Sequence, residues 1–141
     1  MKIIALIGAQ NTGKTQTLLS LITLIKEDGG REIEPDLLLG WEALLEYKGH
    51  RIGITTRGGD ALIQELNCEF FRRYQCDVMI TAARIRTGGI EYLYSLAEDL
   101  SATLIWATKS YYATNISVKP DQGEFDRMNR LEAQFLFNMI D

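Results

Sequence analysis

The sequence has little cysteine, histidine or proline, no long hydrophobic run and no excess of positive charge. Its two cysteines, Cys68 and Cys76, belong to no C-x-x-C or Cys/His pattern, so we expect reduced thiols without a metal. The one histidine, His50, lies in a predicted turn and leaves nothing from which to build a Ser-His-Asp triad. No stretch approaches the roughly 18 apolar residues of a membrane helix, and the apolar opening at residues 1–8 is too short for a signal peptide. We therefore expect a cytoplasmic protein with no membrane partner.

The charge balance and length narrow the class of protein further. The chain has 15 Lys and Arg against 19 Asp and Glu, which gives a formal net charge of -4. The basic stripe typical of duplex-binding modules is missing, so nucleic acid is not an expected partner. With 141 residues, 46% of them hydrophobic and 24% charged, the chain suits one globular core. We predict a single domain over residues 1–141.

Apolar periodicity alternates between short strand-like runs and longer helical ones, which predicts an α/β domain. The first strand, residues 2–7, is apolar without alternation, as expected for a central strand covered on both faces. The glycine-containing connection at 48–50 predicts a β-hairpin, with a helix at 41–47 as the alternative. The patterns predict strands at 2–7, 43–47, 51–56, 78–82 and 102–107, helices at 13–26, 60–74, 90–100 and 124–140, a loop at 109–123, and no assignment for 31–39.

The α/β order further predicts a mainly parallel sheet with helices on both faces, a three-layer arrangement. In two helices the apolar spacing indicates which side faces the core. The residues expected there are Leu62, Leu66 and Phe70 in the helix at 60–74, and Met128, Leu131, Phe135 and Met139 in the last helix.

The sequence GAQNTGKT at residues 8–15 matches the phosphate-binding pattern G-x-x-x-x-G-K-[ST], between the first strand and the first helix. Glycines at both ends of the turn let backbone N–H groups approach phosphate oxygens, and the helix N-terminus adds its dipole. Lys14 is suited to reach the β- and γ-phosphates, and the hydroxyl of Thr15 can bind Mg²⁺. We expect the nucleotide to be bound by Gly8, Asn11, Thr12, Gly13, Lys14, Thr15 and Gln16.

Through this motif the chain resembles the P-loop NTPase superfamily, strictly over residues 8–15 and more loosely through its α/β order. The resemblance implies a single-domain P-loop fold that binds a nucleoside triphosphate and Mg²⁺. By length, and by an apolar strand followed at once by the loop, the chain is also similar to the small GTP-binding adaptors of molybdopterin guanine dinucleotide synthesis. At residues 108–111 the sequence TKSY resembles the guanine-reading element [N/T]-K-x-D, but Tyr111 stands where that element requires Asp. ATP is therefore expected in preference to GTP.

Polar residues after the other strands are further candidates, because ligands bind beyond the carboxyl ends of strands in open α/β sheets. Asp60 is the candidate carboxylate for Mg²⁺, through a water, or for orienting an attacking water or acceptor hydroxyl. The alternative is that Asp60 caps the next helix, and the two roles can coexist. Arg57, Arg84 and Arg86 can each bind two phosphate oxygens, with solvated surface arginines as the alternative; Arg84 is preferred because it lies nearest its strand end. The catalytic candidates are Lys14, Asp60 and Arg84.

These residues predict a nucleoside-triphosphate-binding protein that acts as a Mg²⁺-dependent hydrolase or transfers phosphate to a small-molecule acceptor. Hydrolysis is preferred, because the chain has little room for a lid that excludes water. The alternative is a nucleotide-dependent switch or adaptor with little turnover. In that case the triphosphate reshapes the loops at 57–60 and 84–89 for a protein partner, and a homodimer would suit this role.

Overall fold

The computed structural model describes residues 1–8, 13–33, 41–84, 88–109 and 122–140. Strands and helices alternate along much of this chain, as the periodicity predicts. In chain order the elements are β1 (Lys2–Ile7), α1 (Lys14–Glu27), β2 (Arg31–Glu32), β3 (Glu42–Tyr47), β4 (His50–Thr55), α2 (Ala61–Arg73), β5 (Val78–Ala83), α3 (Ile90–Leu100), β6 (Thr103–Thr108) and α4 (Gln122–Asn138). None of the helices in these ranges is long and apolar enough to cross a membrane.

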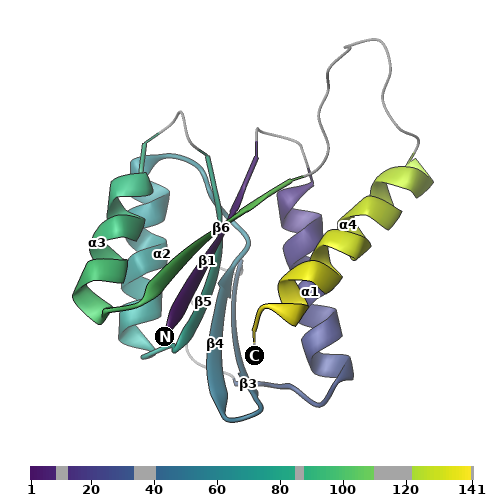
Figure 1. Cartoon of the computed structure of the whole chain (residues 1–141), viewed down its shortest axis with the longest axis horizontal. Coiled ribbons are helices and arrows are strands. Elements are labelled where there is room, and N and C mark those ends of the chain that lie inside the picture. Colours follow the sequence, from purple (N-terminus) through teal and green to yellow (C-terminus); the bar gives the residue numbers. More distant parts are fainter. Residues whose placement is uncertain (9–12, 34–40, 85–87, 110–121, 141) are drawn as a thin grey trace.

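The six strands form one mixed sheet in the order β2-β3-β4-β5-β1-β6 (Figure 1). β1 pairs in parallel with β5 and β6, and β4 pairs in parallel with β5. β3 runs antiparallel to both β2 and β4. The expected parallel arrangement is thus found in four adjacent strands and not across the whole sheet. Because these four strands share one direction, their carboxyl ends meet at one edge of the sheet.

Helices cover both faces of the sheet, which gives the three layers visible in Figure 1. On one face, Ile4 and Leu6 of β1 belong to a core shared with α1 and α4. On the other face, Ile3 and Ala5 belong to a core shared with α2 and α3. All four side chains are almost completely buried, as predicted for a central strand without alternation.

The predicted β-hairpin is confirmed, and the alternative helix at 41–47 is wrong. β3 and β4 pair from Glu42 opposite Thr55 to Tyr47 opposite His50. The connection consists of Lys48 and Gly49, with φ angles of 49° and 80°. Two consecutive residues of positive φ match the twist of a two-residue hairpin, and glycine adopts the second conformation without strain.

The predicted core faces of two helices are confirmed only in part: Phe70 of α2 is 5% exposed, whereas three other predicted residues are exposed. Leu62 is 63% exposed in α2, and in α4 Leu131 and Phe135 are 65% and 62% exposed. Polar residues occupy much of the inward sides instead: Gln64 and Asn67 in α2, and Asn129 in α4, are each no more than 2% exposed. Apolar periodicity misplaced these faces because it assigns polar residues to the solvent side.

Candidate functional site

Gly13 lies directly before α1. Gly13 has a φ of 89°, a left-handed conformation favoured by glycine, and the helix begins at Lys14. None of the described side chains caps this end of α1. The N–H groups of a first helical turn and the helix dipole together favour an anion at such a position. Gly8 and Gly13 are both described, whereas the predicted residues Asn11 and Thr12 lie outside the described residues.

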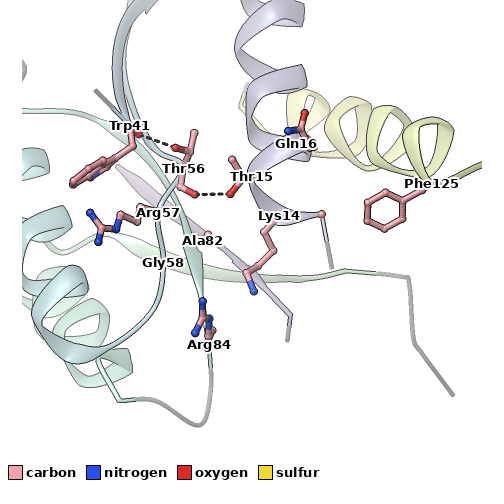
Figure 2. Close-up of a pocket in the computed structure, with 11 residues that line it drawn as sticks. Lys14, Thr15, Gln16, Trp41, Thr56, Arg57, Gly58, Ala82, Arg84 and Phe125 are labelled. Atoms are coloured by element: carbon pink, nitrogen blue, oxygen red, sulfur yellow. Dashed lines mark hydrogen bonds between the residues drawn. The ribbon is translucent and has the colours of Figure 1, made fainter. Parts of the chain in front are cut away.

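A pocket of about 650 Å³ opens beside the N-terminus of α1, at the carboxyl ends of β4 and β5 (Figure 2). It brings together residues from segments far apart in the sequence. Six of the predicted candidates line it: Gly13, Lys14, Thr15, Gln16, Arg57 and Arg84. Five further residues line the pocket: Trp41, Thr56, Gly58, Ala82 and Phe125.

Lys14 lies at the wall of this pocket and is only 8% exposed. Its Nζ donates a hydrogen bond to the carbonyl oxygen of Gly8 at 2.5 Å. Burial, followed by the positive charges of Arg84 and Lys109, lowers the pKa of Lys14 from 10.5 to about 8. An anion in the pocket would favour the charged form of this lysine, because an opposite charge at short range raises the pKa of an amine.

Thr15, the predicted Mg²⁺ ligand, connects α1 to the segment that follows β4. Its Oγ1 donates to the carbonyl oxygen of Thr56 at 3.2 Å. The backbone N–H and the Oγ1 of Thr56 both donate to the carbonyl oxygen of Trp41, each at 3.0 Å. The wall beyond Thr15 is therefore fixed by hydrogen bonds to main-chain carbonyl oxygens.

Two of the three candidate arginines reach the pocket. Arg57 is exposed, and its guanidinium carbon lies 4.1 Å from the centre of the Trp41 ring. Arg84 follows β5, and its Nε is buried without a hydrogen-bond partner in the described part of the chain. The third candidate, Arg86, lies outside the described residues.

Asp60 caps α2, as the alternative reading anticipated: its Oδ1 accepts a hydrogen bond from the N–H of Ile63 at 3.0 Å. Asp60 is exposed and is not among the lining residues of the pocket. The described lining contains no carboxylate, and the described residues contain no group of three or more His, Cys, Asp or Glu that could hold a metal ion. Lys14 and Arg84 thus meet at the pocket, while Asp60 lies outside it.

A buried polar network supports the loop between β4 and α2. Asn67 Nδ2 donates to the carbonyl oxygen of Arg57 at 2.8 Å, and Gln64 Nε2 donates to that of Ala82 at 2.7 Å. Behind them, Thr55 Oγ1 and Thr81 Oγ1 form a 2.7 Å hydrogen bond. Sequence reasoning missed this network; the available signal was the polar pair at 64 and 67 on the inward side of α2.

A second buried network links the end of β6 to α1 and α4. Lys109 is 2% exposed, and its Nζ donates to Thr17 Oγ1 at 3.0 Å, Asn129 Oδ1 at 2.6 Å and Glu132 Oε1 at 2.6 Å. Lys109 lies outside the helices and strands, as expected for the segment after β6, and its side chain joins the end of β6 to α1 and α4. Tyr111, on which the preference for ATP rests, lies outside the described residues.

Comparisons with known proteins add no family assignment. No protein-family model matches the chain, and neither a curated protein nor a solved structure matches it.

Proposed function

We propose that this protein has a P-loop NTPase fold and binds a nucleoside triphosphate with Mg²⁺, ATP in preference to GTP. The observation that carries the proposal is the cationic pocket at the N-terminus of α1, in which Lys14 lies beside Arg84. Position supports it as well, since the pocket lies at the edge where the parallel strands end.

The described residues fit the phosphates of such a ligand. Lys14 supplies a point charge at the pocket wall. Its pKa is lowered first by burial and then by the positive charges of Arg84 and Lys109, and an anion would offset these charges. The unpartnered Nε of Arg84 is a donor that a phosphate oxygen could satisfy. For the metal, Thr15 would supply one hydroxyl oxygen after giving up its bond to Thr56, and Asp60 could act only through water.

As an enzyme, the protein would hydrolyse the triphosphate or transfer its terminal phosphoryl group to a small acceptor. Bound Mg²⁺ would neutralise charge on the phosphates. Lys14 and Arg84 would stabilise the negative charge of the transferred group, and Asp60 would orient the attacking water or hydroxyl. We include a cytoplasmic location in the proposal, which the unpaired state of Cys68 and Cys76 supports.

A second candidate function, a nucleotide-dependent switch or adaptor with little turnover, is favoured by one observation. The described lining has no carboxylate that could serve as a general base. Triphosphate binding would then act mainly on the loop at 57–60, whose backbone already contacts α2 through Asn67. A protein partner or a second copy of the chain would read the change.

Equilibrium binding of fluorescent ATP and GTP analogues, with and without Mg²⁺, tests the proposal. We expect Lys14→Ala to weaken triphosphate binding by at least about tenfold. Lys26→Ala is the matched control, because Lys26 lies in the last turn of α1 and pairs with Glu32 at 2.7 Å. Unchanged affinity in Lys14→Ala would overturn the assignment. Steady-state phosphate release then separates the candidates, since the switch binds nucleotide without appreciable turnover.

A further inference from the structure

Besides Lys14, the pocket has a cationic residue on another wall, Arg57. In Figure 2, Trp41 and Arg57 lie on one side of Lys14 and Phe125 lies on the other. Phe125 belongs to α4 and lies next to Gly13, where its ring carbon Cζ would be 2.8 Å from a Cβ at that position. Trp41 and Arg57 come instead from the ends of β3 and β4. The two sides of the pocket are therefore built by different elements.

Arg57 is held in place from two directions. Its backbone oxygen accepts the 2.8 Å hydrogen bond from Asn67, and its guanidinium lies over the Trp41 ring. Trp41 is itself fixed through the two hydrogen bonds from Thr56 to its carbonyl oxygen. Stacking on an aromatic ring leaves the N–H donors at the edge of a guanidinium available to a ligand. No carboxylate in the described chain forms an ion pair with Arg57.

Gly58 brings this wall close to Arg84. A Cβ at Gly58 would lie 2.2 Å from the carbonyl oxygen of Ala82, so only glycine allows the backbone after β4 to lie this near the end of β5. Arg84 comes two residues after Ala82 in the sequence, and its buried Nε lacks a partner among the described residues. A buried donor without a partner is costly, and a ligand that fills the pocket can supply the acceptor.

The described lining of the pocket carries three cationic side chains and no carboxylate. Lys14 and the N-terminus of α1 already provide an anion site. Arg57 and Arg84 add two guanidinium groups, and the described lining offers no carboxylate to neutralise them. A guanidinium presents paired donors that match the two oxygens of a carboxylate or phosphate.

We propose that Arg57 binds the oxyanion of a second, small-molecule ligand, a phosphate or a carboxylate, which occupies the pocket together with the nucleotide, while Arg84 remains assigned to the phosphates of the nucleotide. This inference rests on the proposed function and narrows its substrate class. The acceptor or regulator is an acidic small molecule, and its anionic group lies on the Trp41 side of Lys14.

Calorimetric titration of the full-length protein tests this, with inorganic phosphate as the probe. The protein is first saturated with Mg²⁺ and a non-hydrolysable ATP analogue, so that phosphate cannot occupy the site of the terminal phosphoryl group. A parallel titration with acetate distinguishes a carboxylate site from a phosphate site. Arg57→Ala is the test variant, because the side chain is exposed and its removal leaves the backbone contact to Asn67 intact.

We expect phosphate or acetate to bind the saturated protein, and Arg57→Ala to weaken that binding by at least about tenfold. Affinity for the ATP analogue should stay within about threefold. Trp41→Leu should weaken anion binding, and Trp41→Phe should retain it, because a phenyl ring still supports the guanidinium. Arg73→Ala removes another arginine that lies on a tyrosine ring, outside the pocket, and serves as the matched control.

Three results would overturn the inference: no anion binding to the saturated protein, displacement of the ATP analogue by the anion, or an equal loss of analogue and anion affinity in Arg57→Ala. The last two would assign Arg57 to the nucleotide site. If wild-type protein binds no ATP analogue but binds phosphate in a manner that depends on Arg57, the proposed function fails and the oxyanion site remains. The two failures are therefore distinguishable.

Discussion

The side-chain amide of Asn129 occupies the space beside Gly13. A Cβ at Gly13 would lie 2.5 Å from Oδ1 and 3.0 Å from Nδ2 of Asn129, so the turn and α4 fit together only with glycine at this position. The Oδ1 accepts hydrogen bonds from Lys109 and Thr17, and the Nδ2 is buried without a partner in the described chain. The last helix thus contacts Gly13, the residue before α1, through a buried polar group.

This contact makes Asn129→Asp an informative substitution. The new carboxylate keeps an acceptor for Lys109 but replaces the Nδ2 donor with a negative oxygen beside Gly13 and the proposed anion site. We expect triphosphate affinity to fall by about tenfold or more, with the protein still folded, as measured by equilibrium binding and thermal unfolding. Glu132→Gln is the control, since it changes another partner of Lys109 and should leave affinity within about threefold. Equal affinities for Asn129→Asp and wild type would contradict this role.

The lowered pKa of Lys14 predicts proton uptake on binding. At pH 8 about half of this amine is neutral in the free protein, and a bound polyphosphate should return it to the charged form. Calorimetry in buffers of different ionisation enthalpy should therefore show uptake of about 0.5 proton at pH 8. Lys14→Arg removes the titrating group but keeps the charge, so the buffer dependence should disappear in this variant. Identical buffer dependence in both proteins would refute the prediction.

The same pKa has a consequence for stability. The folded state disfavours the charged form of Lys14. The free energy that this charge costs on folding is therefore greatest below pH 8, and it declines as the pH rises from about 8 toward 10.5. The free energy of unfolding of Lys14→Met, relative to wild type, should therefore be highest near pH 7 and should fall across that window. Urea denaturation at several pH values measures this difference, and a difference independent of pH would contradict it.

Asp60→Asn separates the capping role from the catalytic one. Asparagine can still accept the hydrogen bond from Ile63, so α2 should stay intact, whereas the negative charge is lost. We expect nucleotide binding to persist and Mg²⁺-dependent phosphate release to decrease. Asp60→Ala removes the cap as well and should lower stability by about 1 kcal/mol. Wild-type turnover in Asp60→Asn would leave Asp60 as a helix cap alone.

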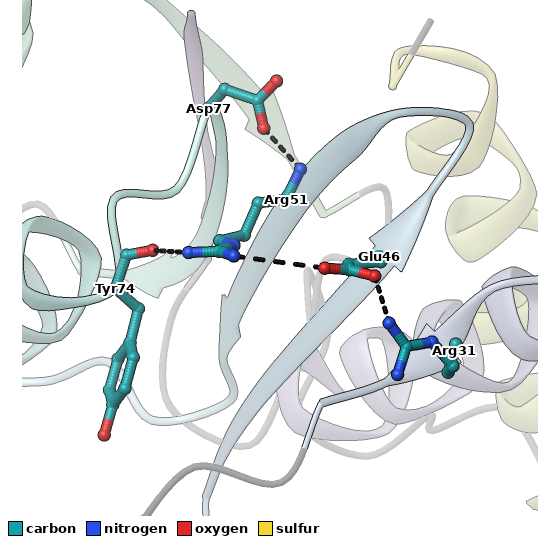
Figure 3. A network of polar contacts seen from close by, with 5 residues as sticks. All are labelled: Arg31, Glu46, Arg51, Tyr74 and Asp77. Atoms are coloured by element: carbon teal, nitrogen blue, oxygen red, sulfur yellow. Dashed lines mark hydrogen bonds and ion pairs between the residues drawn. The ribbon is translucent and has the colours of Figure 1, made fainter.

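Asp77 ties the start of β5 to the hairpin. Its Oδ2 lies 2.9 Å from His50 Nδ1, and its Oδ1 accepts from the N–H of Arg51 at 2.6 Å. Arg51 extends the network to Tyr74 and Glu46, and Glu46 also pairs with Arg31 (Figure 3). Burial alone would raise the pKa of Asp77, but the hydrogen bonds from His50 and Arg51 outweigh it and lower the pKa below 3.8.

The stabilisation from this carboxylate should therefore be fully present above pH 3.8 and should disappear as the pH falls through the lowered pKa. Asp77→Asn should lower the melting temperature at pH 7, and the difference from wild type should vanish in strong acid. Thermal unfolding monitored by circular dichroism at several pH values checks this. A constant difference down to the lowest pH would show that charge plays no part.

Gly53 marks a tight contact between β4 and α2. A Cβ there would lie 2.7 Å from Cys76 Sγ and 3.0 Å from Phe71 Cδ1, and both neighbours are buried. Gly53→Ala should therefore destabilise the protein by about 1–3 kcal/mol through overpacking. Gly59→Ala is the control, because a Cβ at Gly59 meets nothing within 4 Å. Equal stability of the two variants in urea denaturation would be evidence against the overpacking.

Local patterns in the sequence were sufficient to predict the first strand and the first helix. β1 at Lys2–Ile7 has the predicted bounds, and α1 begins within one residue of its predicted start. The hairpin was predictable because its turn residues specify their own backbone conformation. The pattern G-x-x-x-x-G-K-[ST] also predicted that Gly13, Lys14, Thr15 and Gln16 line one site, because they are consecutive residues at the start of one helix.

The tertiary structure alone decided how distant segments complete the site. Lys109 and Thr17 are 92 residues apart, Thr17 and Asn129 are 112 apart, and no periodicity predicts their hydrogen bonds. Buried polar residues escape sequence reasoning because their partners are specified by packing, and an isolated polar residue is otherwise assigned to solvent. The sequence thus determined the local order of β1, Gly13 and α1, and the packing of α2 and α4 against the strand ends determined which charges and amides surround the start of α1.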